Sequence, residues 1–347
     1  MTQLQNLLVL LADDADFEVH VVIHRGQRER LDHFESRITW HEATFREGFF
    51  RRLIWEQLSL PVLARRIGAK VTYAQANYGP LLAPGLVVSL VNTTEVARYE
   101  KRLGKKLYWA ALSAMTFLSL LASKRATAIS EHVRLKLAPF AFLRRKITVI
   151  PPGIDPRFFS FSAVGREMFL LAVGDFYVQK NFPALAQAFV RLAPRFPELT
   201  LCIAGHIIDQ SQADSVTAIA SHAGIADRVA ILGRVGPDQL ADLYSRCAAF
   251  VFPSTAEAFG IPLAEAMAAG APIVSSRASA MPEVAGEAAE YFDPGNVIDM
   301  AAAIERVLTD AGLREKLSKA GRTRATRFDR TGVTAQIAEV FKQAADR

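Results

Sequence analysis

The chain has 347 residues, a length that suggests about two domains, and its 51% hydrophobic and 22% charged residues are typical of a globular protein. This composition excludes collagen-like and disordered chains, and no apolar run is long enough to predict a membrane-spanning helix. The formal net charge is +6, and residues 1–160 hold 23 Lys and Arg against 14 Asp and Glu. The basic half predicts a phosphorylated substrate or an anionic membrane as partner, and no nucleic acid, because zinc-finger, RNP and basic-zipper motifs are absent.

Short apolar stretches alternate with amphipathic helical patterns along most of the chain. In the first half, strands are predicted at residues 19–24, 69–74, 86–91, 126–129 and 147–150. In the second half, they are predicted at residues 168–173, 199–204, 228–232, 249–252, 272–275 and 289–292. Near-continuous apolar strands separated by helices indicate parallel sheets covered on both faces, so the expected fold class is α/β with two doubly wound, Rossmann-like domains.

Three prolines among residues 151–156 cannot continue a strand or a helix, and they mark a stiff connector. We therefore expect an N-terminal domain at residues 1–152 and a second domain at residues 153–330. The apolar spacing of residues 331–347 predicts a C-terminal helix that packs back on the N-terminal domain. Ligands of doubly wound domains bind at the carboxyl ends of the strands, which places the expected site in the cleft between the two sheets.

Residues 252–294 contain the most informative pattern of the chain. A predicted strand is followed by a loop with Glu257 and by a helix with Pro262 and Glu265 in its first turn. The free amides and positive dipole of a helix start suit a phosphate, and carboxylates tolerate such a ligand when they accept hydrogen bonds from its hydroxyls. Alternatively, Glu257 is a solvated loop residue and Glu265 a favourable first-turn charge. The amides at this helix start belong to Phe259, Gly260, Ile261 and Leu263.

This segment resembles the C-terminal signature of glycosyltransferase family 4, whose members are retaining enzymes with two Rossmann-like domains, the GT-B fold. The resemblance implies that Glu257 is catalytic and contacts the donor hexose, that Glu265 binds the nucleotide ribose, and that the amides between them bind the donor. Ala258 stands where glycine is usual in the family. The matching residues are Pro253, Ser254, Glu257, Phe259, Gly260, Pro262, Glu265, Ala266, Met267, Gly270, Pro272, Pro282, Glu283, Val284 and Gly286.

Other parts of the second domain also resemble this family. Residues 168–182 are similar to the strand and loop that supply cations to the donor diphosphate, which implies that Lys180 is a second catalytic residue. The arginine that often accompanies this lysine is absent, because Asp175 and Gln179 occupy the two places where it commonly occurs. Residues 228–253 fit as well. There the resemblance places the backbone of three consecutive residues beside the nucleobase: Gly233, Arg234 and Val235.

The first half departs further from the family. Residues 88–95 resemble the strand end where a histidine commonly lies near the donor sugar. Val91 occupies that place, and Asn92 after it is the expected substrate-binding residue. Family members open with a strand and a glycine-rich loop, whereas residues 4–11 are helix-like here. Either the start of the chain has been set too late or, as we expect, the N-terminal domain lacks its first strand and its Gly-rich loop.

The resemblance implies a retaining glycosyltransferase that moves a hexosyl group, such as mannosyl, from a UDP- or GDP-linked nucleotide sugar. The acceptor implied is a glycan or a polyprenyl-linked saccharide in polysaccharide biosynthesis. No cofactor and no metal are expected, and Cys202 and Cys247 suit neither a disulfide nor a metal site. The alternative is a catalytically weak or inactive GT-B module that binds nucleotide or glycan and supports a partner enzyme. An NAD-dependent oxidoreductase is not favoured, since no GxGxxG follows a strand.

A second candidate surface begins at residues 98–106. Its cations lie beside Tyr99, Tyr108 and Trp109, a combination that suits anionic lipid headgroups. The alternative is a crossover helix buried on the N-terminal sheet with a solvated basic end. Because the sequence has no signal-peptide pattern, we expect a cytoplasmic protein that also binds the inner face of a membrane peripherally. The cations of this expected surface are Arg98, Lys101, Arg102, Lys105 and Lys106.

Overall fold

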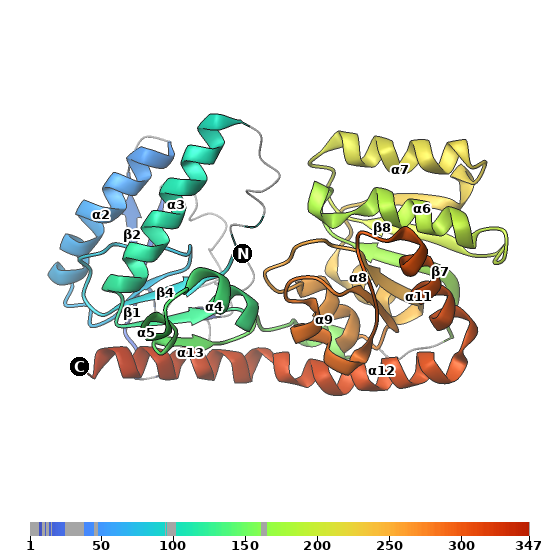
Figure 1. Cartoon of the computed structure of the whole chain (residues 1–347). Helices are drawn as coiled ribbons and strands as arrows, with labels where there is room; N and C mark the ends of the chain where they lie inside the picture. Colours follow the sequence, from blue (N-terminus) through green and yellow to red (C-terminus); the bar gives the residue numbers. More distant parts are fainter. Residues whose placement is uncertain are drawn as a thin grey trace.

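The computed structural model describes residues 7–8, 11, 14, 16–24, 38–44, 48–93, 95, 102–160 and 165–346. Two α/β lobes stand side by side, and helices α12 (Ala311–Ala325) and α13 (Arg330–Ala345) run beneath them (Figure 1). Each lobe contains parallel strands connected by helices. The predicted class, α/β with two Rossmann-like domains, is confirmed.

The second lobe is built on a six-stranded parallel sheet in the order β12-β11-β10-β7-β8-β9. The order reverses between β7 and β10, so the loops that leave these two strands diverge, and we call the place between these loops the crevice. The strands are β7 (Glu167–Val173), β8 (Thr200–Ala204), β9 (Val229–Gly233), β10 (Cys247–Phe252), β11 (Ile273–Ser276) and β12 (Ala289–Phe292). The helices before α12 are α6 (Phe182–Leu192), α7 (Gln210–His222), α8 (Pro237–Arg246), α9 (Ile261–Ala268), α10 (Met281–Ala285) and α11 (Val297–Thr309).

Helices cover both faces of this sheet because its strands are apolar on both sides. Leu171 and Val173 of β7 belong to the core cluster that contains residues of α9, whereas the alternate residues Leu170 and Ala172 belong to the cluster that contains residues of α6 and α11. Side chains alternate between the faces of a strand, so one short run of sequence supplies two cores. The sheet is thereby fixed as the rigid platform from which the loops of the site project.

The N-terminal lobe contains a four-stranded parallel sheet in the order β3-β4-β5-β6 and a separate parallel pair, β1 and β2. The strands are β1 (Val19–His24), β2 (Ile38–Ala43), β3 (Thr72–Ala74), β4 (Leu86–Leu90), β5 (Arg125–Ala128) and β6 (Ile147–Val149). The helices are α2 (Phe49–Arg66), α3 (Leu103–Ala122), α4 (Glu131–Leu137) and α5 (Ala141–Arg144).

Strand β2 was not predicted from the sequence. Its segment ITWHEA places His41 and Glu42 among apolar residues, and its burial pattern is irregular, so neither alternation nor an apolar run marks it as a strand. Pairing with β1 in parallel register makes it one. Residues 1–6 lie outside the described residues, and Leu7 and Leu8 are helical, so the expected absence of a first strand stays a prediction.

Helix α13 packs on the N-terminal lobe although it ends the chain. Its apolar side chains share a core cluster with residues from the start of the chain and from the N-terminal sheet. The Phe341 ring lies edge-on to Tyr73, with 4.9 Å between ring centroids. The cluster contains Leu7, Leu11, Val87, Ile150, Val333, Val340, Phe341 and Ala344.

The chain passes between the lobes twice, and the two crossings lie against each other. The Ile154 amide donates to the Phe328 carbonyl at 2.8 Å, and Asp155 forms ion pairs with Arg157 and Arg330. Burial opposes ionisation of Asp155, but hydrogen bonds from Arg157 and the charge of Arg330 outweigh it and lower the pKa of Asp155. The crossing is therefore held by a backbone hydrogen bond and by ion pairs.

No helix within the described ranges combines the length and the hydropathy that crossing a membrane requires.

Candidate active site

The two residues predicted to be catalytic meet in the crevice of the second lobe. Lys180 ends a 3-10 turn (Val178–Lys180) that follows β7, and Glu257 lies in the loop that follows β10. Lys180 Nζ and Glu257 Oε1 are 2.6 Å apart. Only 14% and 16% of these side chains are exposed. Both loops leave the switch point of the sheet, which is why residues far apart in the sequence form an ion pair there.

The ammonium group of Lys180 is placed by its surroundings as well as by Glu257. Its Nζ lies 5.3 Å from the ring centroid of Phe252, the last residue of β10. Gly174 directly follows β7, and a Cβ there would lie 2.9 Å from Lys180 Cε. The absence of a side chain at Gly174 therefore leaves room for the lysine to reach across the crevice.

Asn181 joins the loops that surround this ion pair, and sequence reasoning missed it. Its Nδ2 donates to the Pro253 carbonyl at 3.2 Å and to the Pro294 carbonyl at 3.0 Å. Its φ of 57° lies in the left-handed region, which asparagine tolerates better than most residues. The Thr255 amide also donates to the Gln179 carbonyl at 2.8 Å. An asparagine directly before a helix with proline in its first turn was the available signal.

Asp175 has a structural role at one of the two places where the family commonly has an arginine. Its Oδ1 accepts a hydrogen bond from the His206 amide at 2.9 Å and so joins the loops after β7 and β8. Lys180 therefore lies in the crevice, and the chain has no arginine at position 175 or 179 to accompany it.

The predicted helix start is present at α9. Gly260 precedes the helix with a φ of 94°, a conformation that glycine adopts without strain. Phe259 is buried, and its ring lies edge-on to Phe328, so its side chain belongs to the core. Ile261 is 43% exposed. The Leu263 amide donates to the Gly260 carbonyl at 3.0 Å, and this internal bond contradicts its predicted place among the free amides.

Glu265 lies in the first turns of α9 with little compensation for its charge. The Tyr244 hydroxyl donates to its Oε2 at 3.4 Å. Burial raises the pKa of Glu265 to about 7, the hydrogen bond from Tyr244 opposes the shift, and the charge of Asp155 adds to it. A buried carboxyl group with a perturbed pKa in a crevice is typical of a functional site.

The remaining predicted residues lie at two other strand ends. Gly233 ends β9 with a φ of 65°, and its carbonyl accepts from the Gly205 amide at 2.9 Å. Arg234 is exposed, and Val235 packs against the core cluster of the second lobe. Asn92 follows β4 in the other lobe, where its backbone is hydrogen-bonded to the side chain of Asn77.

Asn77 fixes the loop that carries Asn92. Its Oδ1 accepts from the amides of Val91 at 2.7 Å and Asn92 at 3.2 Å, and its Nδ2 donates to the Asn92 carbonyl at 2.8 Å. These bonds satisfy the backbone of the loop. The Asn92 side chain is exposed.

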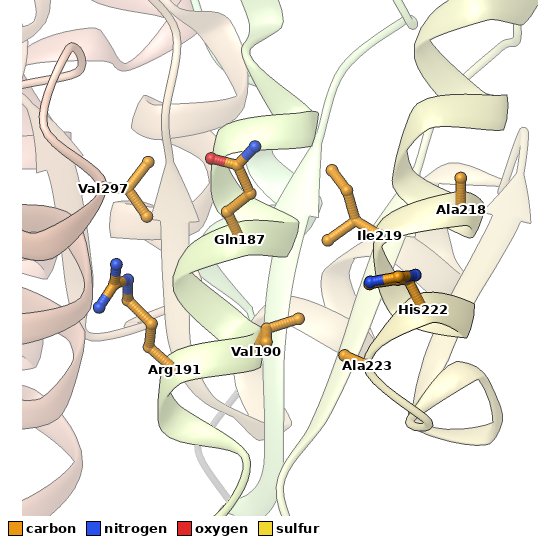
Figure 2. Close-up of a pocket in the computed structure, with 8 residues that line it drawn as sticks. All are labelled: Gln187, Val190, Arg191, Ala218, Ile219, His222, Ala223 and Val297. Atoms are coloured by element: carbon orange, nitrogen blue, oxygen red, sulfur yellow. The ribbon is translucent and has the colours of Figure 1, made fainter.

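A groove of about 700 Å³ lies elsewhere on the second lobe, on the outer side of α6 and α7 (Figure 2). Gln187, Arg191 and His222 are its polar residues, and none of its lining residues comes from the loops at the switch point. We assign the site to the crevice rather than to this groove, because the titratable groups and the helix start converge in the crevice. Within the described part of the chain, no group of three or more His, Cys, Asp or Glu side chains could hold a metal ion.

Comparisons with known proteins agree with this geometry. A family model described as Glycosyl transferases group 1 matches residues 155–324, and one described as Glycosyltransferase Family 4 matches residues 2–158. Over 219 residues, the chain is 31% identical to the MMP alpha-(1->4)-mannosyltransferase of Mycolicibacterium hassiacum, which covers 61% of this chain and 52% of that protein. The chain spans about half, or less, of the length of the first curated relatives it matches.

Solved structures share the whole architecture. A glycosyltransferase from Rickettsia africae ESF-5 has a TM-score of 0.77 at 14% identity over 99% of this chain and 95% of that one. Anabaena Alr3699/HepE in complex with UDP and glucose has a TM-score of 0.75 at 16% identity over 98% and 95%. At such identities the likeness shows the fold alone, which is GT-B. The family matches follow one another along that fold, and the chain belongs to the group 1 and family 4 glycosyltransferases.

Proposed function

We propose that the chain transfers a hexosyl group from a UDP- or GDP-linked nucleotide sugar to a saccharide acceptor, with retention of configuration. An oxygen of the acceptor bonds to the anomeric carbon while the bond from that carbon to the diphosphate breaks. The products are the glycosylated acceptor, the nucleoside diphosphate and the proton of the acceptor hydroxyl. Mannose is the hexose that we favour, since the relative with 31% identity is a mannosyltransferase by its name.

The ion pair of Lys180 and Glu257 is the observation that carries this proposal. A cation at the switch point is placed to stabilise the negative charge that develops on a leaving diphosphate. A carboxylate beside it is placed to accept hydrogen bonds from the hydroxyls of a hexose. Each side chain provides the other with a partner at 2.6 Å, as ionisable groups that are largely buried require.

The residues around the pair fit the rest of a nucleotide sugar. The start of α9 offers the amides of Phe259, Gly260 and Ile261 to a diphosphate. Glu265 has little hydrogen bonding of its own and suits the two hydroxyls of a ribose. The backbone of Gly233, Arg234 and Val235 is our candidate for contact with the base, and Asn92 is our candidate contact from the other lobe.

The N-terminal lobe is our candidate for the acceptor side, with residues 1–152 as one domain and residues 153–330 as the donor domain. Its helix α3 begins with exposed residues, whereas Thr116, Ser119 and Leu120 near its end are buried. Leu103 and Leu107 are 73% and 64% exposed. The exposed start supports an anionic membrane as the docking surface and a polyprenyl-linked saccharide as the acceptor.

A thermal-shift panel of UDP-, GDP- and ADP-sugars tests the donor proposal, because a ligand that binds only the folded state raises the melting temperature. We expect one nucleotide series to raise it, and Glu265→Ala to weaken calorimetric binding of the matching nucleoside diphosphate by about 1.5 to 3 kcal/mol. Glu287→Ala, at an exposed carboxylate, is the matched control. Unchanged affinity in a folded Glu265→Ala variant would contradict the ribose assignment.

Turnover separates an enzyme from a binding module. With the donor that gives the largest shift, we expect the nucleoside diphosphate to accumulate, and the anomeric signal of the product in NMR to match the configuration of the donor. The non-catalytic alternative would be favoured if the donor binds but no nucleoside diphosphate is released, either in water alone or with any saccharide acceptor offered.

A further inference from the structure

The loop that carries Glu257 is bonded to the opposite lobe. Ser130, just before α4, is fully buried. Its Oγ accepts from the Val133 amide at 3.1 Å and so caps the helix, and it donates to the Ala258 carbonyl at 2.6 Å. One hydroxyl therefore joins the start of α4 in the N-terminal lobe to the residue that follows Glu257.

Glu283 bonds to the same helix start from the second lobe. Its Oε1 accepts from the Glu131 amide at 2.6 Å, and its Oε2 accepts from the His132 amide at 2.9 Å. These are the free amides of a helix N-terminus, for which a carboxylate is a strong acceptor. Arg324 of α12 holds the backbone of α10 in place, because its guanidinium donates to the carbonyls of Glu283 and Val284, each at 2.6 Å.

Ala258 adds an apolar contact at the same point. It is partly buried and packs against the core cluster of the N-terminal lobe, which contains Leu90, Ala128 and Val133. Glycine is usual at this position in the signature that the sequence resembles, and glycine has no methyl group to make this contact. The alanine that stands in place of the usual glycine thus lies at the boundary between the two lobes.

A weaker contact lies beside these three. The Ser279 hydroxyl is 3.4 Å from Glu95 Oε2, and Glu95 also pairs with His132 at 2.9 Å and Lys136 at 3.0 Å. Burial opposes ionisation of Glu95, but hydrogen bonds from His132 and Lys136 outweigh it and lower its pKa, so Glu95 remains an acceptor for Ser279.

We propose that Ser130, Ala258 and Glu283 form an interdomain latch that holds the lobes together and positions the Glu257 loop against the N-terminal lobe. Ala258 is bonded to Ser130 through its carbonyl and follows Glu257 directly, so separation of the lobes pulls on the residue next to the carboxylate that pairs with Lys180. The three residues are positioning residues, because they act through Glu257. The inference rests on the proposed role of Glu257 toward the donor hexose.

The test uses Glu283→Gln, Ser130→Ala and Ala258→Gly in the full chain, with Glu287→Gln as the matched control. Gln has one acceptor oxygen and cannot repeat the two bonds of Glu283. Small-angle scattering without ligand should give a larger radius of gyration for Glu283→Gln and Ser130→Ala than for the parent, and no change for Glu287→Gln. A parental radius of gyration in both variants, with their folding checked by circular dichroism, overturns the latch.

Calorimetry with the donor found in the panel tests the effect on Glu257. In the parent, the complete donor should bind more tightly than the bare nucleoside diphosphate because of its sugar. In the latch variants this ratio of affinities should be about tenfold smaller, since hydrogen bonds to a charged group are strong. Diphosphate affinity should stay unchanged, because its contacts lie within the second lobe. An undiminished sugar increment overturns the positioning role. If the parent binds no donor, the proposed function fails, while scattering still decides whether the latch exists.

Discussion

The folded protein stabilises the charged form of the Glu265 side chain poorly. Burial raises its pKa to about 7, the Tyr244 hydroxyl at 3.4 Å opposes this shift, and the charge of Asp155 adds to it. A residue selected only for stability would have a stronger partner or an apolar side chain there. The burial of this carboxyl group supports the ribose contact that we propose for Glu265.

The free energy of unfolding should fall as pH rises through the range in which Glu265 ionises. The pKa of Glu265 is near 4.5 in the unfolded chain and near 7 in the folded protein, so the folded protein binds the proton more tightly. The stabilisation that this proton provides is complete only below pH 4.5. Roughly 3 kcal/mol is lost between pH 4.5 and 7. Glu265→Gln does not titrate, so its melting temperature relative to the parent should be higher at pH 8 than at pH 5.

The comparison needs an exposed carboxylate as a control. For Glu315→Gln on α12, the difference from the parent should be the same at both pH values. A Glu265→Gln difference that is equally independent of pH would show that Glu265 has an ordinary pKa in the folded state.

Lys180 is expected to act mainly in the transition state. Lys180→Met keeps the methylene chain over Phe252 but removes the charge that stabilises the leaving diphosphate, so kcat should fall about 100-fold with a smaller change in KM. Lys319→Met, at an exposed site on α12, should leave both constants unchanged. An effect on KM alone would make Lys180 a binding residue only.

At the scale of elements, helices α2 and α3 present apolar and basic residues together. Ile54, Leu58 and Val62 of α2 recur every four residues, so they form one stripe, and they are 59%, 66% and 63% exposed. The two helices lie on the N-terminal lobe (Figure 1), and both bond to Gly79, α2 through Gln57 and α3 through Ser119. Such a face suits a bilayer surface.

Replacing the exposed cations Arg102, Lys105 and Lys106 with Gln should weaken binding to anionic vesicles. Each cation near an anionic surface contributes about 1 kcal/mol, and salt screens that contribution. Co-sedimentation with vesicles at low salt measures the effect, and replacement of the three exposed cations Lys316, Lys319 and Arg327 on the other lobe is the matched control. Equal co-sedimentation of both variants, or none for the parent, would contradict membrane docking through this face. Arg98 and Lys101 of the expected surface lie outside the described residues.

At the scale of the whole molecule, the last helix stabilises the first lobe. Phe341 of α13 is 6% exposed and lies against Tyr73 and Phe17, with ring centroids 4.9 Å and 6.4 Å away. Because α13 follows the second lobe in the sequence, its packing on the first lobe brings the chain back past the connector at residues 151–156. Stability of the N-terminal lobe thus depends on residues more than 200 positions away.

Phe341→Ala should lower the free energy of unfolding by roughly 3 to 5 kcal/mol, the range for removal of a buried aromatic ring. Urea unfolding followed by circular dichroism measures this loss. Phe142→Ala, at a ring that is 56% exposed, should change stability much less. Equal effects of the two substitutions would mean that α13 does not stabilise the N-terminal lobe.

Elements with a local pattern were predictable from the sequence. The strands at residues 19–24 and 289–292 have the predicted bounds, and the other predicted strands differ from the structure by up to three residues at an end. Glu257 and Glu265 were candidates because they lie beside a predicted strand end and a helix start and match the family 4 signature, whereas Lys180 was a candidate from that resemblance alone. Strand β2 was missed, since its pairing with β1 rather than its own pattern makes it a strand.

By itself, the sequence predicted the two α/β domains and the connector between them, because apolar periodicity and prolines are local properties, and its resemblance to family 4 supplied the candidate charged residues of the site. Only the tertiary structure decided that Lys180 and Glu257 pair, that Asn181 joins three loops, and that Ser130 and Glu283 connect the lobes. These contacts join residues tens to more than a hundred positions apart. Such hydrogen bonds form only when donor and acceptor are placed to within a few tenths of an ångström. This placement requires both sheets and the connector between them to be assembled.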